Sequence, residues 1–111
     1  KLPISDRLLA CANFVGRGNR VAMMIFGPDS VIVVAGMNKI VSTVEEGFNR
    51  TRNIASPPNT VRLNKNTPCA VTGKCGDCMS PDCICNQIVI TRRSRDKDRI
   101  HIILVNDNLG F

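Results

Sequence analysis

The chain of 111 residues contains no tryptophan and no tyrosine, only four phenylalanines and a single histidine. Proteins that bind single-stranded nucleic acid usually stack the bases on aromatic side chains. Because so few rings are available, this sequence offers a poor stacking platform, and nucleic acid is not an expected partner. The single histidine, His101, is far in sequence from most of the cysteines, so an all-cysteine metal site is a better expectation than a mixed one.

Long hydrophobic runs are also missing. No apolar stretch approaches the roughly 20 residues of a transmembrane helix, and no signal-peptide core follows the charged N-terminal residues 1–7. We therefore expect a cytoplasmic protein with no membrane partner. The first residue is not methionine, which agrees with a fragment or a processed product.

The formal net charge is +6 and the isoelectric point is near 9.3, values that attract nucleic acid, anionic lipid or phosphorylated ligands. The basic residues between positions 92 and 99 alternate with Asp96 and Asp98, however, which is typical of a solvated turn. The hydrophobic fraction of 43% is that of a globular chain, and the length fits one domain or a piece of one.

Apolar patterning predicts an α/β fold. Residues 8–15 and 20–26 are interpreted as a β-hairpin around a glycine-containing turn, and residues 30–35 form a continuous β-branched run typical of a strand covered on both faces. Residues 87–92 and 100–105 are interpreted as a second hairpin, at the C-terminal end.

Between these strands, an apolar residue every three or four positions predicts a helix over residues 41–55. Ser42 and Glu45 have the spacing of a capping box, with Asn38 as a rival cap, and Pro57 and Pro58 are expected to end the helix. A strand that leads into a helix in this way is the repeating unit of α/β sheets.

The cysteines carry the strongest chemical signal, because five of the six lie between residues 69 and 85. Four of them are spaced so that they can surround a tetrahedral zinc or a four-iron cluster: Cys69, Cys75, Cys78 and Cys85. Soft thiolates favour zinc or iron–sulfur over magnesium or calcium. Reduced metal-free thiols and disulfides are the alternatives, Cys83 is left as a spare ligand or redox-labile thiol, and Cys11 is expected to be a small buried hydrophobe.

Two segments resemble the LUD-domain family of lactate-utilisation proteins. They are FGPDSVIVVAGMNKIV at residues 26–41 and TPCAVTGKCGDCMSPDCICN at residues 67–86, the second being similar to a cysteine-bearing branch of that family. In that branch the cysteine pattern falls on the same four positions of this chain. Position 83 is more usually an arginine there, so Cys83 is a departure.

The resemblance implies the C-terminal half of an α/β domain similar to CoA transferases and sugar-phosphate isomerases, with the cysteine-rich loop 67–86 inserted before the C-terminal hairpin. Without the other half, one sheet edge and one face would be bare. We therefore expect a homo-oligomer, or pairing with the missing N-terminal half.

The resemblance also implies a role beside iron–sulfur partner proteins in lactate-type oxidation. It supplies no catalytic residue, so enzymatic activity stays open. A small-molecule enzyme with a structural zinc and a zinc-ribbon-like binding module are the alternatives.

A second candidate site follows from the fold class, since ligands of open α/β sheets bind where strands lead into helices. Here that turn contains Gly36, Asn38 and Lys39, which could bind an anionic ligand or cofactor. The plain alternative is that Asn38 caps the helix and Lys39 faces solvent.

Overall fold

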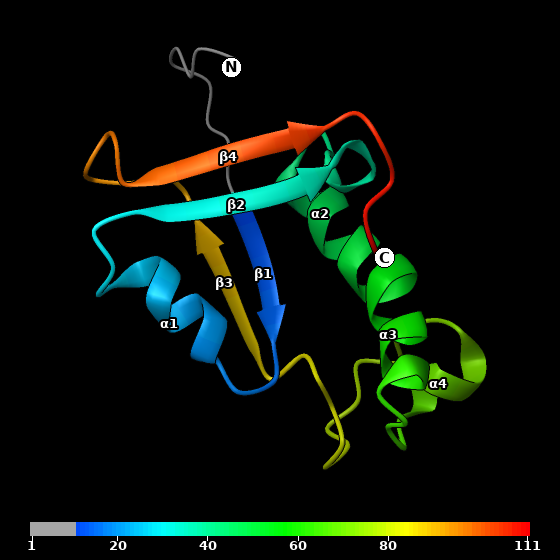
Figure 1. The fold of residues 1–111 in the computed structure, drawn as a ribbon. Helices are drawn as coiled ribbons and strands as arrows, with labels where there is room; N and C mark the ends of the chain where they lie inside the picture. Colours follow the sequence, from blue (N-terminus) through cyan, green and yellow to red (C-terminus); the bar gives the residue numbers. More distant parts are fainter. Residues whose placement is uncertain (1–10) are drawn as a thin grey trace.

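The computed structural model describes residues 11–111 and has a mixed α/β fold, as the sequence predicts (Figure 1). Its elements, in chain order, are β1 (Cys11–Val15), α1 (Asn19–Ile25), β2 (Val31–Gly36), the 3-10 turn η1 (Met37–Lys39), α2 (Val44–Arg50), the π-helical segment η2 (Thr51–Ala55), α3 (Ser56–Arg62), α4 (Pro68–Thr72), β3 (Gln87–Thr91) and β4 (Ile100–Val105). In Figure 1, α1 lies on one side of β1 and the long helical stretch from α2 to α3 on the other.

The four strands form two separate pairs. β1 runs antiparallel to β3, and β2 runs parallel to β4 with Val31 opposite Ile100 and Gly36 opposite Val105. The predicted C-terminal hairpin is therefore wrong, because β3 and β4 each pair with a strand from the first third of the chain. One physical reason is Arg99, whose guanidinium donates hydrogen bonds to the carbonyls of Met24 (2.6 Å) and Pro28 (2.9 Å) and so draws the start of β4 towards β2.

The expected N-terminal hairpin is also wrong in its second strand. β1 is confirmed over residues 11–15, while residues 8–10 lie outside the described part of the chain. Residues 19–25 form α1, which starts after Gly18 in a left-handed conformation (φ 81°). Alanine and methionine at positions 22–24 favour a helix, and α1 buries Val21 (3% exposed).

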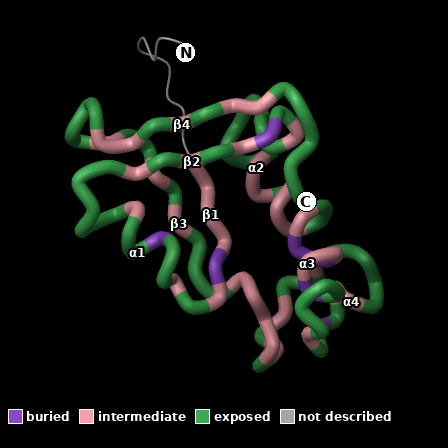
Figure 2. Tube along the Cα trace, in the orientation of Figure 1, coloured by how far each residue is buried: buried purple, intermediate pink, exposed green. Residues whose placement is uncertain are grey.

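The strand predicted at residues 30–35 is confirmed as β2, but it is not covered on both faces. Ile32 is 65% exposed and Val34 is 58% exposed. Ile103, opposite Val34 on β4, is 49% exposed. Figure 2 shows this alternation of exposed and intermediate residues along both strands. Within residues 11–111, one face of the β2–β4 pair is therefore bare, and it is apolar apart from the exposed His101 opposite Ile32.

The predicted helix over residues 41–55 is observed, but it starts later and continues further. α2, η2 and α3 join end to end from residue 44 to residue 62, so the expected stop at Pro57 and Pro58 is wrong. The two prolines occupy the first turn of α3, where their missing N–H groups cost least. The chain enters that turn through the wider π-helical segment, in which the N–H of Ser56 donates to the carbonyl of Thr51, five residues earlier.

The helix begins with Thr43 as its N-cap. The hydroxyl of Thr43 accepts a hydrogen bond from the backbone N–H of Glu46 (3.1 Å), and the Glu46 carboxylate accepts one from the N–H of Ser42 (2.8 Å). The capping pair is thus shifted by one residue from the predicted Ser42 and Glu45, and Asn38 does not cap the helix.

The core within the described residues is small. Val15 (4% exposed) and Val21 are its buried hydrophobic residues, and Phe14 meets Phe48 edge to face with ring centroids 5.2 Å apart. That contact packs α2 against β1. No helix within residues 11–111 combines the length and apolarity needed to cross a membrane.

Candidate functional site

One face of the long helical stretch holds the cysteine-rich loop. The side-chain oxygen of Asn53 accepts a hydrogen bond from the backbone N–H of Cys75 (3.0 Å), and Arg52 forms an ion pair with Asp77 (2.6 Å). Both helical residues belong to the π-helical segment. Such segments are rare and often occur at functional sites.

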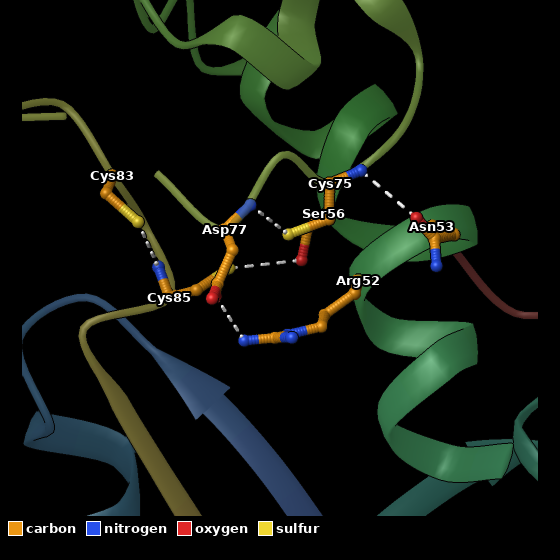
Figure 3. Close-up of polar contacts among 7 residues, drawn as sticks. All are labelled: Arg52, Asn53, Ser56, Cys75, Asp77, Cys83 and Cys85. Atoms are coloured by element: carbon orange, nitrogen blue, oxygen red, sulfur yellow. Dashed lines mark hydrogen bonds and ion pairs between the residues drawn. The ribbon is translucent and has the colours of Figure 1, made fainter. Parts of the chain in front are cut away.

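The next residues along the same face contact sulfur atoms. The hydroxyl of Ser56 lies 3.3 Å from Sγ of Cys85, and the hydroxyl of Thr60 lies 3.6 Å from Sγ of Cys69. Thr67, just before α4, places its hydroxyl 3.3 Å from the same Cys69 sulfur. Figure 3 shows Ser56 and Cys85 joined in this way, with Cys75 beside them. The helix therefore positions cysteines from both ends of the loop.

The cysteines also interact electrostatically with one another. Burial raises the pKa of the Cys85 thiol, the hydrogen bond from Ser56 opposes that rise, and the negative charges of Cys83, Cys75 and Cys69 raise the pKa further. Neighbouring thiolates destabilise one another in this way, and a bound cation would relieve the repulsion.

Two of the four predicted ligands, Cys69 and Cys85, contact neighbouring hydroxyls of α3, and the charges of Cys69, Cys75 and Cys83 act on the thiol of Cys85. Among the described residues, Cys78 is not one of the groups that shift the pKa of Cys85. All six cysteines of the chain are unpaired and only partly exposed. Within residues 11–111, no three cysteine, histidine or acidic side chains already form a metal-binding group, so the predicted ligand set stays a prediction.

A second set of contacts joins the middle of the loop to the residues that precede it. The Asp82 carboxylate accepts a hydrogen bond from the backbone N–H of Asn66 (2.9 Å) and lies 3.9 Å from the ammonium of Lys65. The hydroxyl of Ser80 donates to the carbonyl of Asn66 (3.1 Å). These contacts tie the middle of the loop to the segment that joins α3 and α4.

The strand-to-helix turn is covered by the last residues of the chain. Asn38 accepts a hydrogen bond from the N–H of Leu109 (3.2 Å) and donates one to the carbonyl of Gly110 (3.1 Å), while the ammonium of Lys39 donates to the carbonyl of Phe111. Lys39 is an exposed residue whose ammonium is nevertheless bound by the end of the chain, and desolvation, followed by the nearby charge of Arg50, lowers its pKa.

Gly36 lies beneath the same segment, in contact with its backbone. A ligand at Gly36, Asn38 and Lys39 would have to displace residues 109–111, and the predicted anion site there stays a prediction.

A family model described as the LUD domain matches residues 10–105, which is most of the chain. The chain belongs to the LUD-domain family. Searches of curated proteins and of solved structures give no match. The family membership predicted from residues 26–41 and 67–86 is thus confirmed.

Sequence reasoning missed the residues of this LUD-domain chain that hold its cysteine loop. They are Arg52, Asn53, Ser56, Thr60 and Thr67. The available signal was a series of small polar residues three or four positions apart, at 53, 56 and 60. It was hidden because the helix was expected to stop at Pro57, which would have left position 60 outside it.

Proposed function

We propose that this LUD-domain chain is a redox-linked accessory protein of organic-acid, lactate-type metabolism, with a thiolate-bound metal centre in loop 67–86. One observation carries the proposal. Sulfur atoms from both ends of the loop, those of Cys69 and Cys85, lie against one helical face, with further thiols close enough to raise the pKa of Cys85. A loop that only connected two elements would not need this arrangement.

The donor set fits a soft metal. Cys69, Cys75, Cys78 and Cys85 would hold it, with Cys83, two residues before Cys85, available as a substitute ligand. An iron–sulfur cluster would supply one-electron transfer, whereas zinc would stabilise the loop without redox chemistry. The protein's own contribution is to hold the sulfur atoms of Cys85 and Cys69 against Ser56 and Thr60 of α3 and to keep the cysteines partly shielded from water.

The family and the bare face of β2 and β4 support a proposal for the partners and the location of the chain. We place the chain as the C-terminal half of a domain resembling CoA transferases and sugar-phosphate isomerases. The apolar face of β2 and β4 would be covered by a second copy or by the missing N-terminal half. An iron–sulfur protein would be the redox partner, and the reducing cytoplasm suits the unpaired cysteines.

The test is anaerobic purification followed by elemental analysis and a visible spectrum. We expect iron with sulfide and a broad absorption band near ~400 nm, typical of protein-bound iron–sulfur clusters. The Cys75→Ser, Cys78→Ser variant should lose both iron and colour. Cys11→Ser is the matched control, because Cys11 lies on β1, outside the cysteine loop, and it should keep both.

Two other results would change the proposal. Stoichiometric zinc without colour would make the loop a structural staple and would favour a small-molecule enzyme with its site at the strand-to-helix turn. Absence of any metal from the anaerobic wild-type protein, with free thiols, would refute the metal centre.

A further inference from the structure

The buried polar side chains of the described residues are all hydroxyls, and each lies beside a cysteine sulfur. Among residues 11–111 they are Ser56 (7% exposed), Thr60 (1%) and Thr67 (3%), and all three are hydroxyls within hydrogen-bond distance of a cysteine sulfur. Burying a hydroxyl costs free energy unless it is hydrogen-bonded. The sulfur atoms of Cys69 and Cys85 are therefore structural partners of these side chains.

The three hydroxyls are not equivalent, because each has a single proton to donate. Thr60 gives its proton to the carbonyl of Pro57 (2.7 Å), so towards Cys69 it can only accept. Ser56 and Thr67 have no other side-chain hydrogen bond within the described residues than the one to sulfur. Their protons are free to point at Cys85 and Cys69.

Thr67 is the clearer of the two hydroxyl donors to sulfur. It occupies the N-cap position of α4, where a threonine hydroxyl normally accepts a hydrogen bond from a backbone N–H. Here the hydroxyl makes no such cap bond and lies beside the Cys69 sulfur instead.

Two other sulfur atoms receive hydrogen bonds from the backbone. The N–H of Asp77 donates to Sγ of Cys75 (3.4 Å), and the N–H of Cys85 donates to Sγ of Cys83 (3.4 Å). Each of the four cysteines that interact electrostatically thus has a donor or a hydroxyl beside its sulfur. Only the hydroxyl donors can be removed by a substitution that leaves the backbone unchanged.

We propose that Ser56 and Thr67 are positioning residues that donate hydrogen bonds to the metal-bound thiolates of Cys85 and Cys69. A hydrogen bond to a charged acceptor is about twice as strong as one between neutral groups. The two donors therefore tighten metal binding, and with an iron–sulfur cluster they also raise its reduction potential, since they stabilise the more negative state. This inference rests on the metal centre proposed above.

The test measures metal affinity directly, with Co²⁺ as the probe. The reduced full chain is titrated anaerobically with Co²⁺, followed by the thiolate-to-cobalt absorption, and then with competing Zn²⁺. Thr67→Val and Ser56→Ala should each bind Co²⁺ about 10–100-fold more weakly than wild type, which is the usual effect of removing such a supporting hydrogen bond. Thr67→Ser keeps the hydroxyl and should restore the affinity.

The matched control is Thr51→Val. The Thr51 hydroxyl is also half-buried on the same helical stretch, but it donates to the carbonyl of Gly47 (2.8 Å) and not to sulfur. Its loss should leave Co²⁺ affinity unchanged. Thermal unfolding of each metal-free variant separates a lost hydrogen bond from a damaged fold, and Ser56→Ala, which removes a single oxygen, is expected to keep the fold.

The outcomes separate this inference from the proposed function. Wild-type affinity in both Thr67→Val and Ser56→Ala would overturn the donor role and leave the metal centre standing. An equal loss in Thr51→Val would also overturn it, because the effect would then be a general one on the helix. Failure of the wild-type protein to develop thiolate-to-cobalt absorption would overturn both.

Discussion

Gly36 ends β2 at a point where another part of the backbone approaches closely. A Cβ atom at this position would lie 2.5 Å from Oδ1 of Asn38, 2.6 Å from the carbonyl oxygen of Asp107 and 2.6 Å from the backbone nitrogen of Leu109. Two of these atoms belong to the backbone and cannot move away cheaply. The absence of a side chain is therefore what lets residues 107–109 pack over the end of the strand.

We predict that Gly36→Ala destabilises the protein by about 1–3 kcal/mol, the usual cost of forcing extra atoms into a packed site. Urea unfolding monitored by circular dichroism measures the change. Gly76→Ala is the matched control, because nothing lies within 4 Å of its Cβ, and it should be neutral or slightly stabilising. Equal stability of the two variants would contradict the close approach.

The sequence pointed to the sulfur atoms of the candidate site but not to their surroundings. The cysteines were recognisable from residue type and spacing alone, as was the family. The contacts of Ser56 and Thr60 depend on a helix that continues through Pro57, and no local pattern indicates that the preceding turn widens to accommodate the prolines. Hydroxyl partners of this kind become visible only when the whole helix has been placed.

At the scale of elements, local sequence patterns predicted the type of the clearest segments but not which strands pair with each other. The β-branched run of β2 and the spacing of α2 were both recognised. Residues 20–26 were misassigned because valine, isoleucine and phenylalanine favour strands, while the adjacent alanine and methionines favour the helix that forms. Strand partners could not be predicted, since they depend on contacts such as that of Arg99 with the end of α1.

The start of α2 gives a prediction that separates two neighbouring residues. Thr43→Ala should destabilise the protein by about 1 kcal/mol, because the cap bond to the N–H of Glu46 is lost. Ser42→Ala should change stability by less than about 0.5 kcal/mol, since Ser42 contributes its backbone N–H and not its hydroxyl. Thermal unfolding of the two variants side by side decides the assignment, and a larger loss for Ser42→Ala would reverse it.

At the scale of the whole molecule, the chain leaves much apolar surface exposed for its size. The bare face of β2 and β4 carries Ile32, Val34 and Ile103, all about half exposed or more. Contiguous patches of this kind usually mark an interface. The sequence indicated this indirectly, because a strand with no polar alternation predicts cover on both faces, and the described residues provide it on only one.

We therefore predict that the chain self-associates reversibly through this face. Sedimentation velocity over a wide concentration range should show an oligomer that dissociates on dilution, and the Ile32→Lys, Val34→Lys variant should remain monomeric. Val71→Lys is the control, because Val71 is 88% exposed but lies on α4. A wild-type protein that is monomeric at every concentration, or a control that dissociates equally, would count against the interface.

The pairing order has a further consequence for how the chain acquires its structure. The strand pairs interleave along the sequence, because β1 pairs with β3 and β2 pairs with β4. Val31 can therefore pair with Ile100 only when nearly the whole chain is available. Closing such distant contacts costs entropy before any contact is gained, which slows folding. During synthesis, β2 therefore emerges long before its partner and spends that interval as an unpaired apolar strand, the period in which the nascent chain is most prone to aggregate.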